Sequence, residues 1–80
     1  MKAWEIIEEY GWVKGKLGNS EKGFCILGAI GQKHRDIDIN DLSDLNKDLC
    51  KVRNAVGHIC RWNNNATREK VLTLLKRLDV

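Results

Sequence analysis

Apolar side chains recur through residues 41–60 at alternating intervals of three and four positions. They are Leu42, Leu45, Leu49, Val52, Val56 and Ile59. This spacing repeats every 3.5 residues and places all six side chains along one face of a helix. About two and a half heptads are too few for a free coiled coil, so we interpret the segment as one long amphipathic helix whose apolar face packs on the protein's own core.

Three further segments have helical patterns. Residues 2–10 and 67–79 each carry apolar side chains on one helical face, and Gly11 is a suitable residue to end the first of them. Residues 24–31 are apolar throughout, which fits a buried strand or a short buried helix, and we choose the helix because the rest of the chain is helical. The chain also lacks proline. We therefore predict one all-α domain over residues 1–80, a compact bundle of about four helices with the 41–60 helix as its long central element.

Composition limits the class of protein. The chain has 80 residues, of which 42% are hydrophobic and 31% charged, with a net charge of +3, so a small folded domain is expected rather than disorder. No stretch approaches the roughly 20 apolar residues of a membrane span. Three cysteines fit no disulfide framework and no signal peptide is recognisable, so we expect reduced thiols and a cytoplasmic location.

Charge is distributed unevenly along the chain. After an acidic block, Glu69 is the only acidic residue before Asp79, whereas basic residues are frequent from Lys51 to Arg77. Both parts can be solvated helix faces, and both offer surfaces for a partner of complementary charge. The acidic block comprises Asp36, Asp38, Asp41, Asp44 and Asp48.

The patterns for metal ions are incomplete. Asp36, Asp38 and Asn40 imitate the first ligands of a calcium loop, but the sixth position is not glycine and the twelfth is not glutamate. No C-x-x-C pair is present, and His58 and Cys60 point apart on a helix, so zinc is not expected either. We predict no metal and no cofactor. Instead, Ile37 and Ile39 are expected to anchor a connection, with Asn40 or Ser43 capping the helix that follows.

The segment RWNNN at residues 61–65 stands between two apolar stripes. Asparagine accepts hydrogen bonds at helix starts and tolerates tight turns, so we expect these residues to end one helix and Asn64 or Asn65 to cap the next. Trp62 is expected to pack between the two helices with its indole N–H on a carbonyl. As tryptophan is also a preferred anchor in protein interfaces, the alternative is a partner-binding site at Arg61, Trp62, Asn63 and Asn64.

Four short motifs add a resemblance. GW at residues 11–12, CILGAI at 25–30, WNN at 62–64 and EKVLTLL at 69–75 occur in that order. Their order resembles a family of small uncharacterised proteins of bacteria and phages, in which a W-N-D segment precedes a T-x-x-E-V-L helix. Asn64 stands where that pattern has aspartate, and Glu69 lies two residues after Thr67 rather than three. The resemblance implies a fold and a phage or prophage origin, and no activity.

Three functions are compatible with these observations. The leading hypothesis is a non-enzymatic binding protein that occupies a partner protein's surface, for example an inhibitor of a host defence such as a CRISPR effector, whose basic channel the acidic block would meet. The first alternative is nucleic-acid binding by the basic C-terminal half, with Trp62 as a stacking platform. The second is a cysteine-dependent enzyme centred on Cys25, with His34 or His58 as the base.

Overall fold

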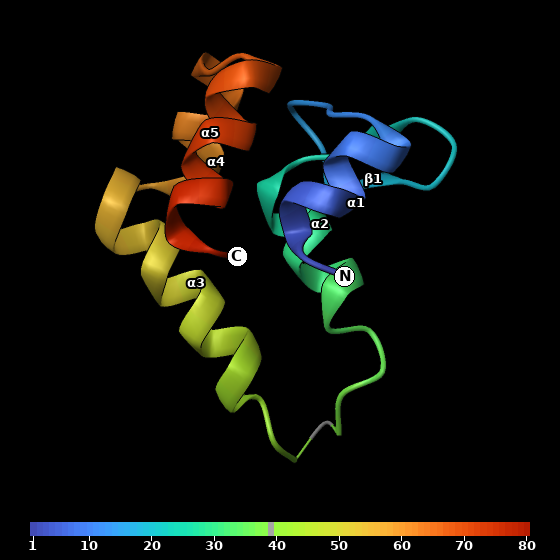
Figure 1. Cartoon of the computed structure of the whole chain (residues 1–80), viewed down its shortest axis with the longest axis vertical. Coiled ribbons are helices and arrows are strands. Elements are labelled where there is room, and N and C mark those ends of the chain that lie inside the picture. Colours follow the sequence, from blue (N-terminus) through green and yellow to red (C-terminus); the bar gives the residue numbers. More distant parts are fainter. Residues whose placement is uncertain (39) are drawn as a thin grey trace.

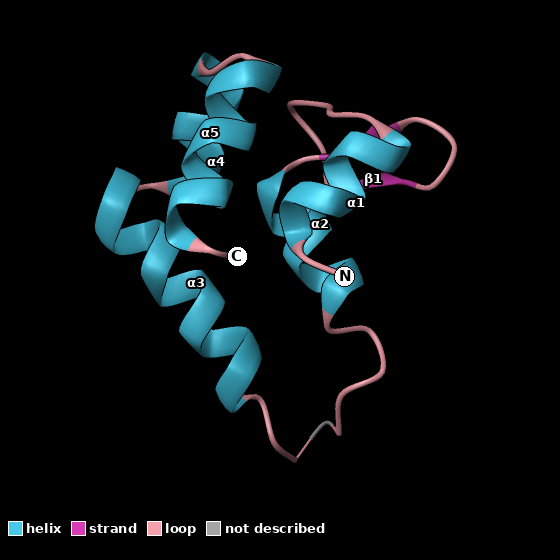
Figure 2. Ribbon diagram, in the orientation of Figure 1, coloured by secondary structure: helices cyan, strands magenta, loops and turns pink. Residues whose placement is uncertain are grey.

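The computed structural model describes residues 1–38 and 40–80. Regular structure in the described residues consists of five helices and one two-stranded hairpin (Figures 1 and 2). Ile39, one of the two expected anchors of the connection, lies outside the described residues. The elements are α1 (Ala3–Tyr10), β1 (Gly18–Asn19), β2 (Gly23–Phe24), α2 (Ile26–Lys33), α3 (Ser43–Val56), α4 (Ile59–Asn65) and α5 (Arg68–Leu78).

The prediction of about four helices was wrong because the long segment 41–60 breaks at Gly57. This residue has φ +79°, a backbone conformation that residues with a Cβ rarely adopt, and its N–H still closes α3 on the carbonyl of Arg53. The chain then restarts as α4, whose first turn is capped by His58: the ring Nδ1 accepts the N–H of Arg61 at 3.2 Å. The mostly helical class therefore holds, with one helix more than expected.

Residues 18–24 form a small antiparallel hairpin. Gly18 pairs with Phe24 and Asn19 with Gly23, and the turn is held by the Asn19 side chain, whose Oδ1 accepts the N–H groups of Glu21 and Lys22. The hairpin lies against the start of α2. A Cβ on Gly28 would stand 2.0 Å from the carbonyl oxygen of Leu17, so only glycine fits there. The absence of a side chain at Gly28 therefore lets the backbone of the hairpin segment approach α2 closely.

The core lies between two groups of elements, with α1, α2 and the hairpin in one and α3, α4 and α5 in the other (Figure 1). The central helix is α2 and not the 41–60 segment as predicted, because α2 contacts α1, α3, α4 and β2. The two ends of the described chain meet in the middle: the Val80 side chain is fully buried, and its carbonyl oxygen accepts the N–H of Ala3 at 3.0 Å. This bond occupies one of the free donors at the start of α1.

Burial along the apolar face of α3 is unequal. Val52 is completely buried, Leu45, Leu49 and Val56 are partly buried, and Leu42 remains 41% exposed. In α5 the expected stripe is buried at Val71, Leu74 and Leu75.

The cap of α3 also differs from the prediction: Leu42 holds the cap position, and the Asp41 carboxylate accepts both the N–H and the hydroxyl of Ser43. Among the described residues, no helix has the length and apolar character needed to cross a membrane.

Candidate partner-binding interface

Asn63 is the most constrained of the three consecutive asparagines. It is 2% exposed, and its Oδ1 accepts the indole N–H of Trp12 at 2.9 Å and the backbone N–H of Ile26 at 3.1 Å. Its Nδ2 donates to the carbonyl of Val13 at 3.3 Å. One amide thus joins α4 to the start of α2 and to the segment after α1. The assignment of Asn63 to a partner-binding surface was therefore wrong, because its polar atoms are used inside the fold.

Neighbouring asparagines have local roles. Asn64 is exposed, and its Oδ1 accepts the N–H of Gly15 at 2.8 Å, while Asn65 donates to the carbonyl of Arg61. Neither caps α5. The cap is Thr67, whose Oγ1 accepts the N–H of Lys70 at 3.3 Å. Our prediction of an asparagine cap failed because α4 continues through Asn65 before the chain turns.

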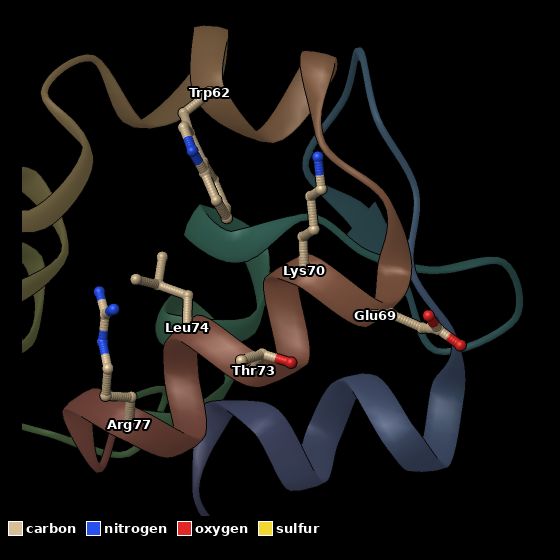
Figure 3. Close-up of a pocket in the computed structure, with 6 residues that line it drawn as sticks. All are labelled: Trp62, Glu69, Lys70, Thr73, Leu74 and Arg77. Atoms are coloured by element: carbon tan, nitrogen blue, oxygen red, sulfur yellow. The ribbon is translucent and has the colours of Figure 1, made fainter.

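Trp62 lies at one wall of an open groove between α4 and α5. The groove has a volume of about 360 Å³ and is lined by Trp62, Glu69, Lys70, Thr73, Leu74 and Arg77. In Figure 3 the indole extends from α4 toward α5, where Leu74 lies next to it. Trp62 is partly buried and packs against the core cluster, as expected for a side chain between two helices. No protein acceptor for its indole N–H occurs among the described residues, so the expected bond to a carbonyl is not formed.

Two cations stand at the rim of this groove. Lys70 and Arg77 lie on either side of Leu74, whereas the carboxylate of Glu69 extends away from the indole (Figure 3). In the described part of the chain neither cation forms an ion pair. Sequence reasoning placed Lys70 and Arg77 with Trp62 only in the nucleic-acid alternative, and it placed Leu74 only in the core. It did not predict these residues as a site for a protein, although their spacing on one helical face after a tryptophan was a usable signal. Arg61, which had been predicted, is exposed on α4 and does not line the groove.

Four members of the acidic block are exposed, namely Asp36, Asp38, Asp41 and Asp44. They lie in the connection after α2 and in the first turn of α3. Hydrogen bonds from the hydroxyl and then the N–H of Ser43 hold the pKa of the Asp41 carboxyl below its ordinary value. These four carboxylates are exposed, and none of them lines the Trp62 groove.

Asp48 does not belong to this exposed surface, which corrects the prediction. It is 7% exposed, and its Oδ2 binds Lys33 Nζ at 2.7 Å and His34 Nε2 at 2.6 Å. Burial alone would raise the pKa of the Asp48 carboxyl, but the hydrogen bonds and charges of His34 and Lys33 outweigh it and lower that pKa. Asp48 therefore connects α3 to the end of α2 instead of meeting a partner.

The thiol of Cys25 caps α2. Its Sγ accepts the N–H of Gly28 at 3.4 Å, and it lines a pocket of about 260 Å³ that also includes Cys60, Asn63 and Asn64. Neither histidine lines this pocket, because His34 is bound to Asp48 and His58 caps α4. No group of three or more metal-binding side chains exists within residues 1–38 and 40–80.

Comparison with known proteins gives one match. A family model described as "Family of unknown function (DUF6197)" covers residues 1–78. No curated protein and no solved structure matches the chain. Three of the short motifs identified in the sequence meet at one place, since the Asn63 amide binds Trp12 of the GW motif and the N–H of Ile26 in the CILGAI motif.

Proposed function

Because the chain belongs to DUF6197, a family of unknown function, we propose from its geometry alone that it is a non-enzymatic binding protein. The binding surface is the groove between α4 and α5, and the partner is another protein. The observation that carries this proposal is the Trp62 indole beside Leu74 at an open groove whose two rim cations form no ion pair in the described chain. Aromatic residues in such positions are preferred anchors of protein interfaces.

The geometry favours a protein over a nucleic acid as the partner. Among the described residues, Lys70 and Arg77 are the only cations that line the groove, and the acidic Glu69 lines it too. Tight nucleic-acid binding at physiological salt needs several neutralised phosphates. The indole also faces Leu74, a side chain that suits an apolar anchor better than a stack of bases.

More specifically, we propose that the protein is an inhibitor of phage or prophage type. It would act in the host cytoplasm on a defence or regulatory protein such as a CRISPR effector. The resemblance of the motifs supports the origin. The exposed carboxylates of Asp36, Asp38, Asp41 and Asp44 support a contact with a basic channel. Expression of the chain in cells with an active CRISPR system should restore plaque formation by a targeted phage, and unchanged interference would exclude this form.

Affinity capture from the native host tests the groove itself. Thr73→Tyr adds a large neutral side chain at an exposed position of the groove without removing a core contact. We expect this variant to lose the retained partner while its circular dichroism spectrum stays native. Asn54→Tyr makes the same kind of change at an exposed position of α3 and should retain the partner.

Two results would overturn the proposal. Equal retention of the partner by wild type and Thr73→Tyr would place the binding surface elsewhere. Retention that disappears after nuclease treatment would replace the protein partner with a nucleic acid and favour the basic C-terminal half as a nucleic-acid surface.

A further inference from the structure

We infer that the groove binds an acidic segment of its partner, in which two carboxylates flank one apolar side chain. This inference rests on the proposed function and specifies the chemistry of the partner. Three observations carry it: the apolar character of the groove between its two cations, the unused charge of those cations, and their spacing along α5.

The centre of the groove suits one apolar side chain. Leu74, which is 6% exposed, lies beside the partly buried Trp62 indole, so an incoming aliphatic or aromatic group would contact both (Figure 3). A volume of about 360 Å³ is enough for a large side chain and part of its backbone, and too small for a folded domain. The occupant is therefore a short segment.

Charge determines what flanks that side chain. Residues 59–78 contain five basic residues and one acidic residue, a net charge of +4 that exceeds the +3 of the whole chain. Lys76 is used within the fold, since it pairs with Glu8 at 3.0 Å and lies over the Trp4 ring. Lys70 and Arg77 have no such partner in the described chain, so carboxylates of another molecule are the complementary groups.

The spacing between Lys70 and Arg77 determines how many residues the bound segment needs. Lys70 and Arg77 are seven residues apart on α5, which places them about 10 Å apart along the helix axis. A peptide in the polyproline II conformation rises about 3.1 Å per residue and returns to the same face every third residue, so positions i and i+3 span about 9 Å on one face. The matching motif is an acidic residue, two residues of which at least one is apolar, and a second acidic residue.

Heteronuclear NMR provides the test. The probe is a short acetylated peptide in which two glutamates enclose a pair of leucines. On titration, the signal of the Trp62 indole N–H should shift, because this N–H has no protein acceptor among the described residues. The signal of Trp12, whose N–H is bound to Asn63, should not move. A peptide with glutamines for glutamates should bind at least about tenfold more weakly, and so should one with serines for leucines.

Matched variants separate site binding from general attraction. Lys70→Glu combined with Arg77→Glu should weaken binding at least about tenfold, while Arg68→Glu, which changes charge in the same helix outside the groove, should alter it less than about threefold. No shift of the Trp62 signal at about 1 mM peptide would overturn the inference. A shift produced by an oligothymidylate and not by the peptide would also overturn it.

The two proposals can fail separately. If Thr73→Tyr abolishes capture of a protein partner while the acidic peptide does not bind, the groove remains the interface and the acidic chemistry is wrong. If the acidic peptide binds as expected but Thr73→Tyr still captures the partner, the groove accepts such segments but is not where that partner is held.

Discussion

Residues of one type have different roles in this protein because of where the fold places them. Asp48 is buried between Lys33 and His34, whereas Asp36 is exposed in the connection. Asn63 is buried with its amide oxygen and nitrogen both bonded, and Asn65, two positions later, is exposed with one local bond. Composition and residue spacing do not distinguish the buried residues of each type from the exposed ones. Their difference arises from contacts across about 15 to 50 residues of sequence, which no local pattern contains.

Removal of the Asn63 amide tests its structural role. Asn63→Ala leaves the indole N–H of Trp12 and the backbone N–H of Ile26 without their acceptor. We expect a loss of roughly 1–3 kcal/mol in unfolding free energy for each donor that stays buried and unpaired. Urea unfolding followed by circular dichroism measures it. Asn65→Ala is the matched control and should change stability by less than about 0.5 kcal/mol, so equal effects of the two substitutions would contradict the role.

The free energy of unfolding should depend on pH through the Asp48 carboxylate. Its pKa lies below the ordinary 3.8 in the folded state, so ionised Asp48 contributes stability that is fully present above that value and is lost as pH falls through the folded-state pKa. Asp48→Asn should therefore destabilise the protein by about 1–3 kcal/mol near pH 6, where charged hydrogen bonds are intact. The difference from wild type should shrink below about pH 4.

Unfolding free energies at a series of pH values check this expectation. Asp36→Asn, at an exposed carboxylate, should cost less than about 0.5 kcal/mol near neutral pH. A wild-type advantage over Asp48→Asn that stays constant into strong acid would show that the carboxylate's charge is not what stabilises α3 against α2.

At the scale of elements, amphipathic periodicity identified helices but not where they stop. The stripes of α1 and α5 were recognised because each has one uninterrupted face and a short length. The 41–60 segment keeps its 3-4 spacing through Gly57, so the pattern predicted one helix where the backbone makes two. Periodicity reports which side chains share a face, while the break depends on a backbone angle that only glycine takes easily.

Alanine substitutions at Gly57 and Gly31 compare a glycine at the end of a helix with one inside a helix. A Cβ at either position meets nothing within 4 Å, but Gly57 has φ +79° and Gly31 lies within α2. Gly57→Ala should cost roughly 1–2 kcal/mol through backbone strain alone. Gly31→Ala should stabilise by about 1 kcal/mol because alanine favours helices. Thermal melts of both variants provide the measurement, and a stabilising Gly57→Ala would mean that a continuous helix is readily accessible.

Burial along α3 gives a second expectation for this element. The heptad pattern ranks its apolar residues equally, but Val52 is fully buried and Leu42 is 41% exposed. Val52→Ala should therefore cost about 2 kcal/mol, from two buried methyl groups and the cavity they leave. Leu42→Ala, which removes more carbon, should cost less than about 0.5 kcal/mol. Urea midpoints in the opposite order would place the packed face of α3 on the side of Leu42.

For the whole molecule, the sequence predicted the class and the single hydrophobic core better than the site. Helical stripes, the absence of proline and the small size all favour a mostly helical protein, and these features are local or compositional. The groove needs Trp62 from α4 beside Leu74 and Arg77 from α5, an arrangement set by how two helices pack. Sequence analysis therefore named Trp62 and assigned Lys70 and Arg77 to a basic half of the chain, but it did not bring these side chains together with Leu74 in one groove.

The two groups of helices should unfold as one unit. The two groups are connected by contacts of α2 with α3 and α4, by the hydrogen bond from the Ala3 N–H to the Val80 carbonyl, and by the Asn63 amide. Hydrogen exchange under native conditions should then give the slowest amides of α2 and α5, such as those of Ile30 and Leu75, the same opening free energy within about 0.5 kcal/mol. A slower Leu75 amide, with Ile30 exchanging through an earlier opening, would show that α3, α4 and α5 hold together without α1 and α2. Because the proposed groove lies between α4 and α5, that result would also mean that the groove can stay folded and bind a partner while α1 and α2 are unfolded.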